Sequence, residues 1–158
     1  AEIAVELGYK QIYWFRGGIL SWRQYQYKMK VNKTLNSIQL SKLKPEKLQK
    51  LLSNDNDVQV IDVRPLWWRE NDIQAGLIKG TDLLIPLLKL DQSLHLIDKE
   101  LPVIVVDRQM RQSQHAAKYL IQQGYEVLGI LKGGSKRWVN EGLPTLSKED
   151  EPTMMNNR

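Results

Sequence analysis

The chain has 158 residues, enough for one globular domain of ordinary size with some surplus. Hydrophobic residues make up 42% and charged residues 26%, and no apolar run approaches the roughly 20 residues that span a bilayer. The formal net charge is +5, and the absence of cysteine excludes disulfides, zinc–thiolate sites and all thiol chemistry.

The N-terminal segment repeats a segment near the other end of the chain. Residues 1–22 and 117–138 align without a gap at an offset of 116. The identities pair Ala1, Gly8, Tyr9, Gly17, Gly18 and Trp22 with Ala117, Gly124, Tyr125, Gly133, Gly134 and Trp138. We therefore interpret residues 1–27 as the C-terminal tail of a preceding repeat and the chain as a fragment of a tandem protein. Trp14 or Trp22 is then expected to be buried against the complete domain or a second chain.

A basic stretch follows the tail. The first 50 residues hold ten basic and three acidic side chains, and we interpret residues 28–37 as a basic linker. One interpretation is binding of nucleic acid or an acidic protein, with Trp22, Tyr25 and Tyr27 as stacking groups. The other is a solvated linker before an amphipathic helix that begins at Pro45. We favour the linker, keep an acidic protein as a candidate partner, and do not expect nucleic acid.

Residues 38–145 alternate between strand and helix patterns. Strands are predicted at 58–63 and 83–85, a polar and partly helical excursion at 66–75, and a helix at 87–96. This alternation predicts an α/β fold with about five short parallel strands and helices on both faces. Residues 146–158 form a polar C-terminal tail.

The stretch from Leu101 to Gly134 carries the strongest pattern. Val103–Val106 is a β-branched run typical of a buried strand, and Val127–Leu131 is a second one. Between them we predict a polar loop, a helix capped by Ser113, and a helix end at Gly124. The loop follows the carboxyl end of a strand and faces a helix N-terminus, where α/β folds place their chemistry.

These features, in order, resemble a rhodanese-like (sulfurtransferase) domain. Its second half matches at Ser113, Ala116-Ala117, Gly124-Tyr125, Gly133-Gly134, Trp138 and Gly142-Leu143-Pro144. Its first half matches at Val60-Ile61-Asp62-Val63-Arg64, at Gly76-Leu77-Ile78-Lys79-Gly80 and at Ile85-Pro86-Leu87. The resemblance covers residues 38–145 and implies the rhodanese-like fold. In that family a Cys thiolate takes up a sulfane sulfur as a persulfide, which backbone N–H groups of the loop stabilise.

The loop departs from the family pattern at the positions that carry this chemistry. Asp107 stands at the Cys position, Met110 at a Gly position and Gln112 at an Arg position. The resemblance therefore implies a vestigial anion loop without a catalytic residue. Its members are Asp107, Arg108, Gln109, Met110, Arg111, Gln112 and Ser113. Because Met tolerates positive φ poorly, we expect the loop to have relaxed, with N–H groups that no longer converge.

Other site chemistry finds little support in the sequence. A phosphate-accepting Asp107 would need a second carboxylate and Mg²⁺, and its neighbours Arg108 and Gln109 supply neither. His95 and His115 lack acidic or thiol neighbours at ligand spacing, so we expect no metal and no cofactor.

Three functions remain open. The first is an inactive rhodanese-like domain with a structural or regulatory role beside a second rhodanese-like domain, in the same or another chain. The second is part of a tandem thiosulfate- or 3-mercaptopyruvate-type sulfurtransferase, whose nucleophilic Cys lies upstream and whose substrate Arg108 and Arg111 help to bind. The third is a binding module that presents its basic linker to an acidic protein. We favour the first, do not expect this chain itself to be an enzyme, and expect no membrane partner and a cytoplasmic location.

Overall fold

The computed structural model describes residues 37–53, 57–65 and 76–146, together with Gly8, Lys10, Gln24 and Tyr25. The chain divides into two compact units, Ala1–Thr34 and Leu35–Arg158. The tail of the predicted repeat lies almost wholly outside the described residues, as do Trp14, Trp22, the excursion at 66–75 and most of the C-terminal tail. The domain boundaries derived from the repeat therefore stay predictions.

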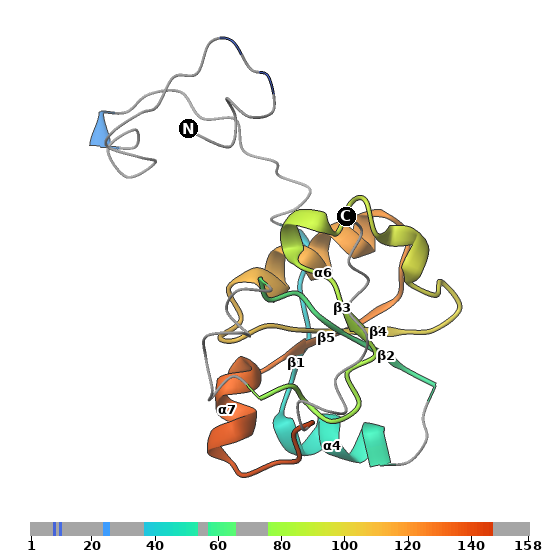
Figure 1. Ribbon diagram of the computed structural model, residues 1–158, viewed down its shortest axis with the longest axis vertical. Coiled ribbons are helices and arrows are strands. Elements are labelled where there is room, and N and C mark those ends of the chain that lie inside the picture. Colours follow the sequence, from blue (N-terminus) through green and yellow to red (C-terminus); the bar gives the residue numbers. More distant parts are fainter. Residues whose placement is uncertain are drawn as a thin grey trace. The chain divides into compact units, whose positions relative to one another are not determined.

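The second unit alternates between strands and helices along the chain (Figure 1). In order, the elements are β1 (Lys42–Leu43), α4 (Pro45–Ser53), β2 (Gln59–Asp62), β3 (Leu83–Leu84), the 3₁₀ turns η1 (Leu87–Lys89) and η2 (Leu94–Leu96), β4 (Val103–Val106), α6 (Gln112–Gln122), β5 (Val127–Leu131) and α7 (Gly134–Asn140).

Within the described residues, five strands form one sheet in the order β1-β5-β4-β2-β3, and every pairing is parallel. The predicted α/β fold with about five short parallel strands is therefore confirmed. Strand β4 lies at the centre of the sheet, and its four residues are fully buried. Helices cover both faces of the sheet, so a central strand needs apolar side chains on both sides. That is why Val103–Val106 is a continuous apolar run.

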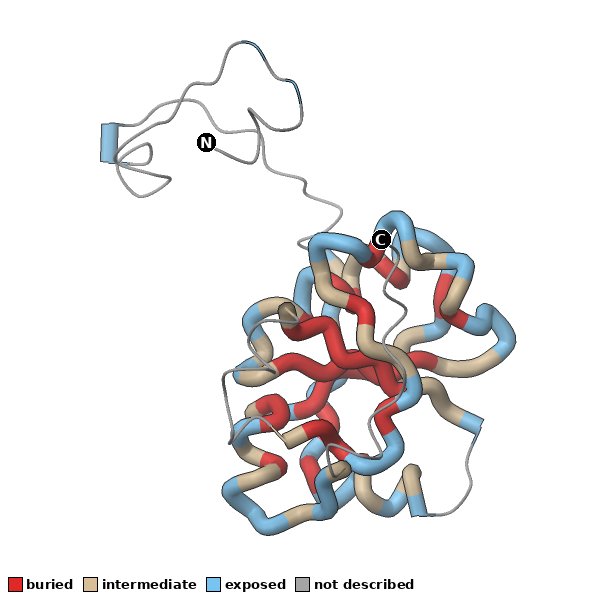
Figure 2. The backbone as a smooth tube through the Cα atoms, viewed as in Figure 1, coloured by how far each residue is buried: buried red, intermediate tan, exposed pale blue. Residues whose placement is uncertain are grey.

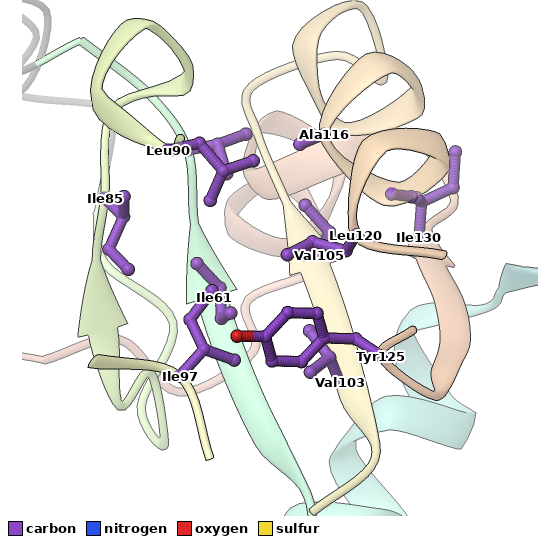
Figure 3. Packing of buried hydrophobic residues seen from close by; sticks show 12 residues of the cluster. Ile61, Ile85, Leu90, Ile97, Val103, Val105, Ala116, Leu120, Tyr125 and Ile130 are labelled. Atoms are coloured by element: carbon purple, nitrogen blue, oxygen red, sulfur yellow. The ribbon is translucent and has the colours of Figure 1, made fainter. Parts of the chain in front are cut away.

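Side chains of alternate residues in the central strands pack into two separate hydrophobic cores, one on each face of the sheet. On one face, Ile61, Val103 and Val105 pack with Ala116 and Leu120 of α6. The ring of Tyr125 closes this core beside Ile97, and its hydroxyl donates to the carbonyl of Leu94 at 2.8 Å (Figure 3). Figure 2 shows the buried backbone concentrated in the central strands. This core fixes α6 on the sheet, and with it the loop that precedes α6.

The opposite face is covered by α4 and α7 (Figure 1). Leu48 of α4 and Trp138 of α7 pack there with Val60, Ile104 and Val106 of the strands. The indole N–H of Trp138 donates to the carbonyl of Pro144 at 2.8 Å, because a buried donor needs a partner. The Gly142-Leu143-Pro144 segment is thus tied to α7, and Thr145 continues into an antiparallel bridge with Ile78.

Two local predictions are wrong. The helix predicted at 87–96 is instead two short 3₁₀ turns, and Ser93 between them has φ −109° and ψ 10°, outside the α-helical region. Ser113 does not cap α6, because the helix begins one residue earlier, at Gln112. The Ser113 hydroxyl is buried in the loop and bonds there. The predicted start of a helix at Pro45 is confirmed by α4. The predicted end of a second helix before Gly124, which has φ 83°, is confirmed by α6.

Strand β1 was missed because its two residues lie in a lysine-rich stretch without an apolar run. Only the register of Lys42 opposite Ile130 and Leu43 opposite Leu131 identifies it. In the part of the chain that the structure describes, no helix is long and apolar enough to cross a bilayer.

Candidate functional site

The loop of the candidate site is held from two sides. It leaves β4 at Asp107 and enters α6 at Gln112. The first turn of α7 lies against its backbone: the N–H of Ser135 donates to the carbonyl of Asp107 at 2.8 Å, and that of Lys136 to the carbonyl of Arg108 at 3.2 Å. Strand β4 and the helices α6 and α7, which pack on opposite faces of the sheet, therefore set the position of this short loop.

The Asp107 carboxylate occupies the centre of the loop and is only 2% exposed. Oδ1 accepts the N–H of Met110 at 2.5 Å and the hydroxyl of Ser113 at 3.2 Å. Oδ2 accepts the N–H of Gln112 at 2.6 Å and that of Ser113 at 3.2 Å. Successive N–H groups aimed at one point form an anion-binding nest, and here the anion belongs to the chain itself. We call residues 107–113 with this donor set the cradle.

The expectation that the loop had relaxed is therefore wrong. Its N–H groups do converge, and Met110 takes φ 62°, the one positive φ at a non-glycine position among the described residues. Two contacts compensate the strain at Met110. Its side chain packs against the core under α6, and its carbonyl accepts the side-chain amide of Gln114 at 2.6 Å. A sequence pattern that reports residue preference could not reveal these compensating contacts.

The Gly133-Gly134 pair lets α7 approach the cradle. A Cβ atom on Gly134 would stand 2.3 Å from the carbonyl oxygen of Arg108 and 2.5 Å from that of Asp107, closer than any real contact. Gly134 also has φ 64°, which a side chain would strain. The glycine pair that carried part of the family resemblance thus has a direct role in positioning Asp107.

A cavity of about 140 Å³ opens over the cradle. Its lining residues are Asp107, Arg108, Gln109, Arg111 and Gln112. Two arginines therefore line this cavity together with a buried carboxylate whose hydrogen bonds the loop already supplies. The side-chain oxygen of Gln112 is buried and has no hydrogen-bond donor within reach. The structure thus brings all seven sequence-predicted residues into one site, with a small cationic cavity.

Next to the cradle, strand β2 ends in an ion pair that sequence reasoning did not single out. Asp62 and Arg64 are 1% and 0% exposed, and Arg64 Nη2 stands 2.6 Å from Asp62 Oδ2. Arg64 Nε and the Arg64 backbone N–H also donate to this carboxylate. Asp62 lies in register with Val106, the residue before Asp107. The Asp-Val-Arg spacing in the sequence was the available signal, because the two side chains then lie on the same side of the extended chain.

Two ionisable groups outside the cradle have shifted pKa values. Burial raises the pKa of the Tyr125 hydroxyl, and the nearby Tyr119 adds to that rise. Desolvation raises the pKa of Asp82, while its hydrogen bond from the N–H of Val60 acts in the opposite direction. His95 and His115 are exposed. Across residues 37–53, 57–65 and 76–146, no group of three potential ligands is placed to hold a metal ion.

Comparison with known proteins identifies the fold family. The model of the rhodanese-like domain matches residues 44–141. A protein named sulfurtransferase from Allochromatium vinosum is 29% identical over 110 residues, which cover 70% of this chain and 98% of that protein. A thiosulfate sulfurtransferase from Pseudoalteromonas translucida is 33% identical over 89 residues, covering 55% of this chain and 78% of that protein.

Solved structures agree with this assignment. A rhodanese-like domain protein from Staphylococcus aureus superposes with a TM-score of 0.56 at 25% identity, covering 68% of this chain and all of that one. A rhodanese-related protein from Thermoplasma volcanium has the same fold, with a TM-score of 0.57 at 21% identity over 66% of this chain and 96% of its own. The resemblance carried by Asp62-Val63-Arg64, Ala116-Ala117 and Gly133-Gly134 is confirmed, and the chain belongs to the rhodanese-like domain family.

Proposed function

We propose that this chain is a catalytically inactive rhodanese-like domain with a structural or regulatory role beside a second rhodanese-like domain. One observation carries the proposal. The Asp107 carboxylate, 2% exposed, accepts four hydrogen bonds from the cradle. In the family this position holds the nucleophile, and the chain contains no cysteine to replace it.

The chemistry of the two side chains differs in one decisive respect. A thiolate attacks a sulfane sulfur, keeps it in an S–S bond and releases the remaining anion, such as sulfite from thiosulfate. The carboxylate oxygens of Asp107 offer no sulfur for that bond, and the four donors already hold them in place. Asp107 thus keeps the cradle in its anion-bound shape without a transferable group.

The activity test uses thiosulfate as sulfur donor and cyanide as acceptor. We expect the chain to form thiocyanate at the blank rate, with the Pseudoalteromonas relative as the positive control. A rate that rises in proportion to the concentration of this protein would overturn the proposal.

A series of variants tests which of the substituted loop positions prevent sulfurtransferase activity. The change Asp107→Cys returns the nucleophile but leaves Gln112 where the family has Arg, so the substrate anion still lacks a fixed cationic partner. We expect thiocyanate formation above the blank only when Asp107→Cys is combined with Gln112→Arg. Activity of Asp107→Cys alone at the rate of the double variant would show that Gln112 is not limiting.

The tandem sulfurtransferase remains the second candidate, since Arg108 and Arg111 line the cavity over the cradle. In that case the nucleophilic Cys belongs to the preceding repeat that the offset of 116 residues implies. Expression of the whole reading frame separates the two candidates. A sulfurtransferase rate that survives Asp107→Ala but is lost when an upstream Cys is replaced would favour the tandem enzyme.

A further inference from the structure

A cluster of lysines that the chemistry of the cradle does not use lies on the exposed side of α4 and on the residues just before this helix. Lys44, Lys47 and Lys50 follow one another at three-residue spacing, and Lys42 lies on the neighbouring strand β1. All four are exposed, whereas Leu48 on the other side of the helix is fully buried. Burial of Leu48 fixes the rotation of α4, and Lys47 and Lys50 therefore face away from the core. We call Lys42, Lys44, Lys47 and Lys50 the lysine surface.

The lysine surface is hollowed. Lys44, Glu46, Lys47 and Lys50 line a depression of about 440 Å³. Glu46 stands four residues before Lys50, a spacing at which an ion pair often forms on a helix. Among the described residues, however, no carboxylate lies within ion-pair distance of Lys44, Lys47 or Lys50. Three lysines thus line one hollow, and none of them has an acidic partner among the described residues.

The charge of the domain is concentrated here. Residues 37–53 contain four basic side chains and one acidic side chain, a net charge of +3. Residues 57–65 and 76–146 contain ten basic and nine acidic side chains, a net charge of +1. Since these 80 residues are nearly neutral, most of the excess charge of the described domain arises from residues 37–53. A local excess of this kind raises the local concentration of oppositely charged partners and their association rate.

We propose that the lysine surface binds an acidic segment of a partner protein. The carboxylates of an acidic segment are separate groups, so they can pair with Lys44, Lys47 and Lys50 and stay apart from Glu46. A phosphate backbone carries a charge at every nucleotide and would be repelled by Glu46. Surfaces that bind single-stranded nucleic acid combine cations with aromatic stacking groups, and residues 40–52 contain no aromatic side chain. The methylene stems of the lysines add apolar contact to the floor of the hollow.

The test measures binding of a fluorescein-labelled peptide of twelve glutamates to the whole chain by anisotropy. The test variant is Lys44→Gln with Lys47→Gln and Lys50→Gln. The matched control replaces the exposed Lys79, Lys89 and Lys136 by Gln, which removes the same charge elsewhere on the domain. Thermal unfolding of both variants shows that the fold is kept, since all six side chains lie at the surface.

We expect the test variant to bind the peptide about tenfold more weakly than the wild-type chain, as three exposed ion pairs are lost, and the control to change by less than about twofold. Affinity of the wild-type chain should also fall as salt is added. Equal loss in both variants would reduce the effect to net charge and overturn the proposal. Tighter binding of an oligothymidylate through the same lysines would overturn it in favour of nucleic acid, and no binding by the wild-type chain would overturn it outright.

Discussion

Two buried aspartates lie at the carboxyl ends of the neighbouring strands β2 and β4, and the charges of their carboxylates are satisfied in different ways. Asp62, at the end of β2, is held by the guanidinium of Arg64. Asp107, after β4, accepts three backbone N–H groups and one hydroxyl. A cation neutralises the first, and fixed dipoles stabilise the second. The first carboxylate is therefore neutralised within an ion pair, whereas the second lies among fixed donors that can hold an anion of another origin.

The largest effect on stability is expected at the ion pair between Asp62 and Arg64. The change Arg64→Met leaves the Asp62 carboxylate, 1% exposed, without its cation. We expect the free energy of unfolding in urea to fall by about 3 to 5 kcal/mol, the cost of breaking a buried pair from one side. The double variant Asp62→Asn with Arg64→Met should recover part of this loss. If the free energy of unfolding of Arg64→Met lay within about 1 kcal/mol of the wild-type value, the ion pair would not contribute to stability as proposed.

A smaller loss, open to rescue, is expected at the cradle. Asp107→Ala leaves three N–H groups and the Ser113 hydroxyl without their acceptor, and we expect a loss of about 2 to 3 kcal/mol. Because the donors converge on one point, added formate should occupy it and stabilise this variant by mass action. Midpoints of thermal unfolding in formate and in chloride at equal ionic strength provide the measurement.

The comparison supplies the controls for this rescue. The wild-type chain already holds a carboxylate in the cradle, and Arg64→Met lacks a cation rather than an anion. Formate should therefore stabilise neither of them beyond the effect of chloride. Equal stabilisation of all three proteins would mean that formate acts on the surface in general and not at the cradle.

The contrast also shows what the sequence could and could not predict. The strand at Val103–Val106 and the end of α6 before Gly124 followed from the apolar run and the glycine, since burial on both faces and positive φ restrict residue choice. The position of Asp107 at the carboxyl end of β4 followed as well. Convergence of the cradle did not, because packing under α6 and a side-chain bond from Gln114 override the preference of Met110.

The smallest effect concerns the strain at Met110. Both Met110→Ala and Met110→Gly remove the side chain from the core, so their difference isolates the positive φ of 62°. We expect the Gly variant to be more stable than the Ala variant by about 1 kcal/mol in urea unfolding. The same pair of changes at the neighbouring exposed Gln109 should give the opposite order, since that residue has no positive φ. If the Gly variant were more stable than the Ala variant at position 109 as well, the strained geometry at Met110 would be contradicted.

The central claim is that the cradle survives intact and stabilises a negative charge at position 107. The most direct measurement is the thiol pKa of the Asp107→Cys variant, obtained from the rate of iodoacetamide alkylation against pH. The wild-type chain contains no cysteine, so the introduced thiol reacts alone. Gln92→Cys, at an exposed position outside the cradle, supplies the control and should titrate near the free value of about 8.5. We predict a pKa for Cys at position 107 well below that of the control, and a value equal to or above the control would contradict the claim.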